Sequence, residues 1–170
     1  GGAGDDSLSG WYGDDTYQYN LGDGADVIHD NSWQHDTNDT LIFGPGITAQ
    51  DISVRQSSDR ESIILTLSQG GSVTLLGVLA DHDDRIENII FNDGTQWSFA
   101  DLIEQSATGD SQDNILHGAN GFNSRLIGAA GHDTLIGDNG DDTLIGGAGD
   151  DSLSGWYGDD TYQYNLGDGA

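Results

Sequence analysis

The chain has 170 residues, of which 30 are acidic and only 4 are basic, so its formal net charge is -26. A surface of this sign repels phosphate backbones and anionic lipid headgroups, which argues against nucleic-acid binding and membrane-surface attachment. The chain has no cysteine, which excludes disulfides and thiolate metal sites. Its longest apolar run, around residues 75–80, is far shorter than the ~20 residues of a membrane span, so we expect no membrane insertion.

A nine-residue pattern opens the chain. The segments GGAGDDSLS, from Gly1, and GWYGDDTYQ, from Gly10, share glycine at positions one and four and aspartate at position six. After a two-residue insert at Tyr19 and Asn20, the segment LGDGADVIH continues the pattern from Leu21. The sixth-position acids of these three copies are Asp6, Asp15 and Asp26.

The middle of the chain has a different pattern. Glycine is sparse around residues 31–40, which argues against a metal role for Asp30, Asp36 or Asp39. Polar and apolar residues then alternate, and they predict strands over residues 63–67 and 72–75, a hairpin within 86–99 and a short helix over 100–104. We interpret residues 31–105 as a small antiparallel β-rich segment that caps the repeats, whose last coil would otherwise expose open strand edges.

The nine-residue pattern returns in the last third of the chain. The segments GAAGHDTLI, GDNGDDTLI, GGAGDDSLS and GWYGDDTYQ follow one another without a break between residues 128 and 163. A weaker copy precedes them at Asp113, and another has Ser124 where aspartate is expected. The sixth-position acids of the four regular copies are Asp133, Asp142, Asp151 and Asp160.

The chain also repeats over a longer distance, because residues 1–25 are identical to residues 146–170. An artificial duplication is one explanation of this identity. The other, which we favour, is a tandem array with a unit of 145 residues. Residues 1–30 would then end one block of repeats, residues 31–105 would cap it, and residues 106–170 would start the next unit.

The spacing of the acids has a physical consequence. Six residues of each copy suit a glycine-rich turn and three suit a very short strand, so two copies complete one coil and aspartates 18 apart stack on the same edge. Asp133 would stack with Asp151 and Asp142 with Asp160, while the insert separates Asp6 from Asp26 by 20 residues. Like charges ~4 Å apart repel by about 1 kcal/mol even in water, so the stack requires cations. Carboxylate and carbonyl oxygens suit Ca²⁺, whose binding would be coupled to folding.

The nonapeptides resemble the RTX (repeats-in-toxin, haemolysin-type) Ca²⁺-binding repeat. The segments IENIIFNDGTQWSFADL and DTLIFGPGITAQDI resemble the haemolysin-type calcium-binding-related module that follows such repeats. The resemblance implies an all-β fold, a Ca²⁺-loaded parallel β-roll with the antiparallel segment as its cap. It also implies that the sixth-position aspartates named above are Ca²⁺ ligands together with carbonyls of the turns, and that fifth-position acids are weaker candidates. The implied turn ligands are Gly137, Asn139, Gly146 and Ala148, and the fifth-position acids are Asp141, Asp150 and Asp159.

Aromatic residues recur within the repeats and allow two interpretations. They would form either a sugar-stacking patch or a hydrophobic cap on the roll, and we favour the cap. The residues are Trp11, Tyr12, Tyr17 and Tyr19 in the first copy and Trp156, Tyr157, Tyr162 and Tyr164 in the second.

The sequence favours a structural function. It contains no glycine-elbowed serine, no HExxH and no EF-hand pattern, so we expect no enzymatic activity. We expect a Ca²⁺-binding repeat module of a large secreted bacterial RTX protein, an adhesin stalk or extracellular filament that folds outside the cell after type I secretion. Its partners would be Ca²⁺ and neighbouring copies of itself. The alternatives are the Ca²⁺-folding secretion block of an RTX toxin or hydrolase and a module that binds extracellular polysaccharide.

Overall fold

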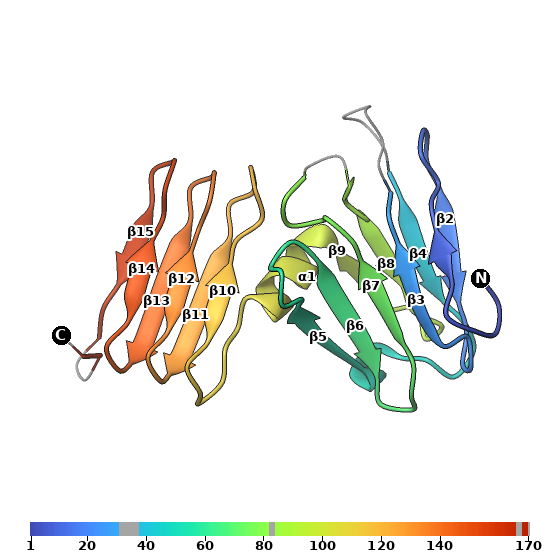
Figure 1. Cartoon of the computed structure of the whole chain (residues 1–170), viewed down its shortest axis with the longest axis horizontal. Helices are drawn as coiled ribbons and strands as arrows, with labels where there is room; N and C mark the ends of the chain where they lie inside the picture. The colour runs from blue at the N-terminus through green and yellow to red at the C-terminus, as the bar shows by residue number, and fades with distance from the viewer. Residues whose placement is uncertain (31–37, 82–83, 166–167, 170) are drawn as a thin grey trace. The chain divides into compact units, whose positions relative to one another are not determined.

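The computed structural model describes residues 1–30, 38–81, 84–165 and 168–169. The fold is all-β, with one short α-helix among the described residues (Figure 1). The chain forms two compact units, Gly1–Leu102 and Ile103–Ala170, which are described one at a time below. No helix in the described part of the chain is long and apolar enough to cross a membrane.

The first unit contains two sheets. Nonapeptide strands begin both of them, and strands of the middle segment complete them. A single turn of 3-10 helix, Ala49–Asp51, leads into strand β5. The five-stranded sheet has the order β1 (Ser7–Leu8), β3 (Ala25–Ile28), β7 (Ser72–Leu75), β6 (Ile63–Leu67) and β5 (Ile52–Gln56). The four-stranded sheet has the order β2 (Thr16–Tyr19), β4 (Thr40–Phe43), β8 (Asn88–Ile90) and β9 (Gln96–Ser98).

The middle segment, from residue 38 on, covers the open edges of both sheets of the repeats by continuing them. β7 pairs in parallel with β3, placing Ser72 beside Ala25, and β8 pairs in parallel with β4, placing Asn88 beside Thr40. The predicted hairpins then add antiparallel strands, β6 on one sheet and β9 on the other, and β5, a strand that was not predicted, pairs with β6. The physical reason is the open edge of each parallel sheet, whose backbone groups need hydrogen-bond partners.

The core of the first unit lies where these sheets bury alternate side chains. Leu41, Leu65 and Ile89 are inaccessible to solvent. Phe43 stacks on Phe91 with ring centroids 5.2 Å apart and meets Tyr19 edge-on at 5.9 Å. Because Phe43 belongs to β4 and Tyr19 to the neighbouring nonapeptide strand β2, the middle segment and the repeats share one hydrophobic core.

The second unit contains two parallel sheets of three strands, and successive strands alternate between them. The registers place Thr134 beside Ser152 and Thr143 beside Thr161, 18 residues apart, as the nine-residue period predicted, whereas Ile115 of the first, irregular copy lies beside Thr134, 19 residues away. The helix α1, Phe99–Ser106, precedes these strands. One sheet contains β10 (Ile115–His117), β12 (Thr134–Ile136) and β14 (Ser152–Ser154). The other contains β11 (Arg125–Ala130), β13 (Thr143–Ala148) and β15 (Thr161–Gln163).

A cluster of aliphatic side chains forms the core of the second unit. Three of the four regular nonapeptides supply their eighth-position leucine to this cluster or to its margin, whereas Tyr162, at position eight of the last copy, is exposed. The cluster contains Ala107, Leu116, Leu126, Leu135 and Leu144, with Leu153 packed against it. A core this narrow leaves the unit dependent on interactions in its turns.

Candidate metal sites

The sixth-position aspartates form hydrogen-bonded ladders along the stacked coils. The N–H of Asp133 donates to Oδ1 of Asp151 at 2.9 Å. The N–H of Asp142 donates in the same way to Oδ1 of Asp160 at 3.0 Å. In the first unit the N–H of Asp6 donates to Oδ1 of Asp26 at 3.0 Å, so the two-residue insert does not disturb the pairing. The predicted stacking of these acids is confirmed.

The second carboxylate oxygen, Oδ2, lies against the glycine that opens the same nonapeptide. A Cβ added to Gly137 would collide with Oδ2 of Asp142, and one added to Gly128 would collide with Oδ2 of Asp133. Neither glycine has a positive φ. Position one therefore requires glycine because the carboxylate approaches closely, and not because the backbone is left-handed.

A backbone carbonyl from the next coil faces the same point. A Cβ added to Gly128 would lie close to Oδ2 of Asp133. It would also lie 2.5 Å from the carbonyl oxygen of Gly146. A Cβ added to Gly137 would lie close to Oδ2 of Asp142 and 3.0 Å from the carbonyl oxygen of Gly155. Gly128 and Gly137 thus mark places where oxygens from successive coils converge.

The buried oxygens at these places are a chemical fit for a cation. Asp26, Asp133 and Asp142 are each about 1% exposed, and their Oδ2 atoms have no hydrogen-bond partner among the described residues. The pKa of Asp142 is raised to about 6, chiefly by burial and also by the charge of Asp160, against the lowering effect of the hydrogen bond from the Ser124 N–H. A buried, unpaired carboxylate is unfavourable unless a cation compensates it, and an all-oxygen set suits Ca²⁺.

The other predicted turn ligands are placed differently. The carbonyl oxygen of Ala148 already accepts the N–H of Gly131 at 3.0 Å. The side-chain amide of Asn139 donates to Oδ1 of Asn120 at 2.5 Å. The carbonyl oxygen of Gly146 lies against Gly128, beside Oδ2 of Asp133, and the carbonyl oxygen of Gly137 lies against Gly118, beside Oγ of Ser124.

The fifth-position acids lie on the outside of the turns. Asp141, Asp150 and Asp159 are exposed. Oδ1 of Asp141 accepts the N–H of Asp159 at 2.9 Å, and the N–H of Asp150 meets Nδ1 of His132 at 3.2 Å. These acids hold successive turns together from the solvent side, opposite to the buried oxygens.

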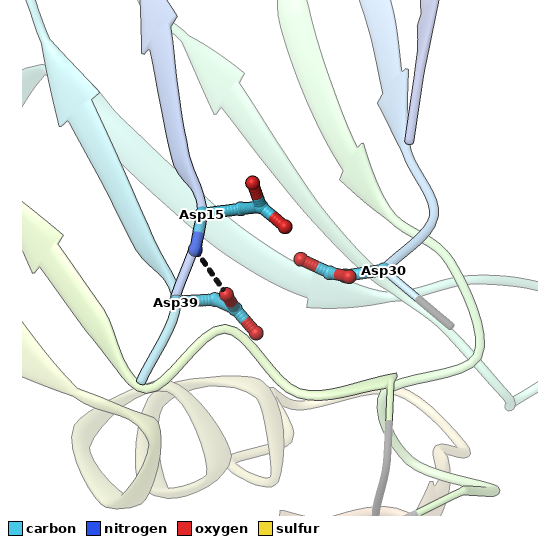
Figure 2. A group of neighbouring side chains, drawn as sticks. All are labelled: Asp15, Asp30 and Asp39. Carbon is cyan, nitrogen blue, oxygen red and sulfur yellow. Dashed lines mark hydrogen bonds between the residues drawn. The ribbon is translucent and has the colours of Figure 1, made fainter. Parts of the chain in front are cut away.

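The structure also brings together three acids that the glycine pattern did not predict as a group. Asp15, Asp30 and Asp39 each offer an oxygen within 4.8 Å of the other two (Figure 2). Sequence reasoning assigned no metal role to Asp30 or Asp39, and Asp36 lies outside the described residues. A signal for Asp39 was present, because Asp39-Thr40-Leu41-Ile42 repeats the letters DTLI that follow from Asp133 and from Asp142.

The aromatic residues of the repeats divide into two groups. Tyr17 and Tyr19 are buried, and the Tyr17 hydroxyl donates to Oδ2 of Asp30 at 2.8 Å while the Tyr19 hydroxyl donates to the carbonyl of Gly24 at 2.6 Å. The other six aromatic residues of the two copies are exposed: Trp11, Tyr12, Trp156, Tyr157, Tyr162 and Tyr164.

Comparison with known families agrees with this geometry. Residues 1–28, 108–144, 119–153 and 136–169 match the RTX calcium-binding nonapeptide repeat. These matches cover more than half of the chain, which therefore belongs to this family of Ca²⁺-binding proteins. Residues 63–101 match the haemolysin-type calcium binding protein related domain.

Among solved structures, the chain is similar to the crystal structure of the extracellular lipase LipA from Serratia marcescens. The two are 20% identical, with a TM-score of 0.31, and the similarity covers 98% of this chain and 30% of the lipase chain. The chain thus spans less than a third of that protein's length. No curated protein matched the chain.

Proposed function

We propose that the chain is a Ca²⁺-binding structural module of a large secreted protein, repeated in tandem to form an adhesin stalk or extracellular filament. The observation that carries the proposal is the identity of residues 1–25 and 146–170. The module has no catalytic role in this proposal.

The paired parallel sheets would be the two faces of a Ca²⁺-loaded β-roll. The sixth-position aspartates and the carbonyls of Gly137 and Gly146 would hold the ions, with Asn139, Ala148 and the fifth-position acids Asp141, Asp150 and Asp159 as further candidates. The support for this is the convergence of buried oxygens from successive coils at the first-position glycines. Bound Ca²⁺ neutralises the stacked carboxylates and links one coil to the next.

The two copies of the repeated segment differ in burial. Tyr17 and Tyr19 are 7% and 2% exposed, whereas their copies Tyr162 and Tyr164 are 44% and 71% exposed. In the first copy the covering groups are Asp30 and Phe43, which follow the repeated segment in the chain. The second copy therefore presents an uncovered surface that a following copy of residues 26–102 would bury.

The strand pairing supports the same continuation. β14 and β15 have the sequences of β1 and β2, which pair with β3 and β4 in the first unit. In a tandem array, β14 and β15 would pair with the β3 and β4 strands of the next unit. Both sheets would then run from one unit into the next, and a continuous hydrogen-bonded sheet resists bending better than a chain of independent domains.

The charge suits a protein that folds outside the cell. Where Ca²⁺ is scarce, repulsion among the stacked carboxylates opposes folding, which would keep the chain extended for passage through a secretion channel. Where Ca²⁺ is abundant, binding to the folded chain alone would stabilise each coil by mass action.

A chain of three 145-residue units, compared with a single unit, tests the array. In Ca²⁺, small-angle scattering and electron microscopy should show a stiff rod whose length increases in proportion to the number of units. The control is the same chain in chelator, which should lose this shape. Three globules joined by flexible links in saturating Ca²⁺ would contradict the proposal.

A further inference from the structure

Three carboxylates meet inside the first unit, each from a different segment. Asp15 immediately precedes β2, Asp39 immediately precedes β4, and Asp30 follows β3 in the other sheet. Figure 2 shows the three side chains directed toward a common space. Asp30 is 1% exposed and Asp39 is fully buried, while Asp15 is partly buried.

Hydrogen bonds fix these side chains and leave oxygens directed into the space. Oδ1 of Asp39 accepts the N–H of Asp15 at 2.7 Å, and Oδ2 of Asp30 accepts the Tyr17 hydroxyl at 2.8 Å. Oδ1 of Asp30 and Oδ2 of Asp15 are buried and have no hydrogen-bond partner among the described residues. Asp30 is thus an almost completely buried carboxylate with one oxygen that has no hydrogen-bond partner in the described part of the chain, which is unfavourable unless a cation compensates it.

The surrounding charges are of the same sign. The pKa of Asp30 is raised to about 6, chiefly by burial and also by the charges of Asp39 and Asp15, while the hydrogen bond from the Tyr17 hydroxyl lowers it. Burial also raises the pKa of Glu87, whose carboxylate accepts the N–H of Asp39 at 2.8 Å. Four acids therefore lie in contact or close to it in the interior of a strongly acidic protein.

We propose that Asp30 and Asp39, together with the sixth-position Asp15, complete a binding site for a divalent cation, Ca²⁺ in the natural setting. Three carboxylates without nitrogen or sulfur ligands suit this hard cation. Asp30 and Asp39 lie outside both family matches, which end at residue 28 and resume at residue 63. The ion would join β2 and β4 to the end of β3, and so tie the two sheets together where the repeats give way to the following strands.

The repeated segment offers a comparison within the chain. Tyr162 is the copy of Tyr17, but its hydroxyl accepts the N–H of Gly155 at 2.8 Å instead of donating to a carboxylate. Asp160, the copy of Asp15, is grouped with no such acidic cluster among the described residues. The site thus depends on Asp30 and Asp39 and would form once in each 145-residue unit.

Substitution of Asp30 tests the site by counting ions. Asp30→Asn should bind one Ca²⁺ fewer per chain than the unchanged protein in equilibrium dialysis, with the same circular dichroism in saturating Ca²⁺. The matched control is Asp93→Asn, at an exposed turn position, which should bind the full number. A full number of ions on a folded Asp30→Asn chain would overturn the site. It would leave the proposed function intact, because that function is tested separately by the shape of the three-unit chain in Ca²⁺.

If Asp30→Asn does not fold, the variant Tyr17→Phe tests the cation site instead. Tb³⁺ replaces Ca²⁺ at oxygen sites and emits light when a nearby aromatic ring is excited. Tyr17→Phe should lose one component of this sensitised emission, since the Tyr17 hydroxyl touches Asp30. Tyr164→Phe, at an exposed residue, is the control. Unchanged emission from Tyr17→Phe would overturn the site.

Discussion

At the scale of single residues, the sixth-position aspartate and the first-position glycine act as a pair. One carboxylate oxygen joins a backbone ladder, as between Asp133 and Asp151, and the other occupies the space beside a glycine. A side chain at that glycine would displace the oxygen. The nonapeptide therefore repeats the first-position glycine, which leaves room for the oxygen, together with the sixth-position aspartate, which supplies the charge.

Gly137→Ala should lower both stability and Ca²⁺ affinity, since its Cβ would collide with Oδ2 of Asp142. We expect at least a tenfold loss of affinity at that coil, or about 1.4 kcal/mol. Calorimetric titration with Ca²⁺ measures this loss.

The control is Gly94→Ala. Gly94 has a φ of +87° and nothing within 4 Å of its Cβ position, so alanine there should cost about 1–2 kcal/mol through the backbone alone. Its Ca²⁺ affinity should not change. Equal affinities in the two variants would show that the Asp142 oxygen takes no part in binding.

The sequence predicts one part of the site and misses the other for a physical reason. Asp133, Asp142, Asp151 and Asp160 follow from the nine-residue period, because the coil has constant length in that region. Asp15 and Asp39 are 24 residues apart, and a fixed period cannot predict their pairing. Asp30 joins them from the other sheet, a contact that depends on how the sheets pack.

At the scale of elements, each nonapeptide strand is too short to be stable alone. β12 and β14 have three residues each, and they persist because parallel neighbours and a shared aliphatic core support them. The core is thin, so each eighth-position side chain supports the coils on both sides of it.

Leu135→Ala should lower the free energy of unfolding by about 2–5 kcal/mol, because Leu135 is fully buried and its loss leaves a cavity in the core. Urea unfolding in saturating Ca²⁺ measures the change. Ile115→Ala is the control, since Ile115 is 46% exposed and should lose far less. Equal losses at the two positions would contradict the account of the core.

The sequence predicts strands better than their partners. Alternation located the strands at 63–67 and 72–75, and turn residues located the hairpin that β8 and β9 form. The parallel pairing of β7 with β3 and of β8 with β4 was not predicted, because parallel partners are distant in the chain and no short turn indicates them.

At the scale of the whole molecule, the formal net charge of -26 opposes folding, because folding brings like charges together. Several of the acids are buried, and burial raises the pKa of Asp133, Asp142 and Asp30. Divalent cations at the stacked aspartates would lower the net charge and supply the partners that buried oxygens require. Ca²⁺ is thus a structural component of the folded chain in this account.

Circular dichroism of the chain during titration with Ca²⁺, starting from full chelation, tests this claim most directly. The account predicts little β-structure in chelator, a cooperative gain of β signal as Ca²⁺ is added, and reversal when chelator is restored. A chain that keeps the same β signal and the same thermal unfolding midpoint after complete removal of Ca²⁺ would contradict it.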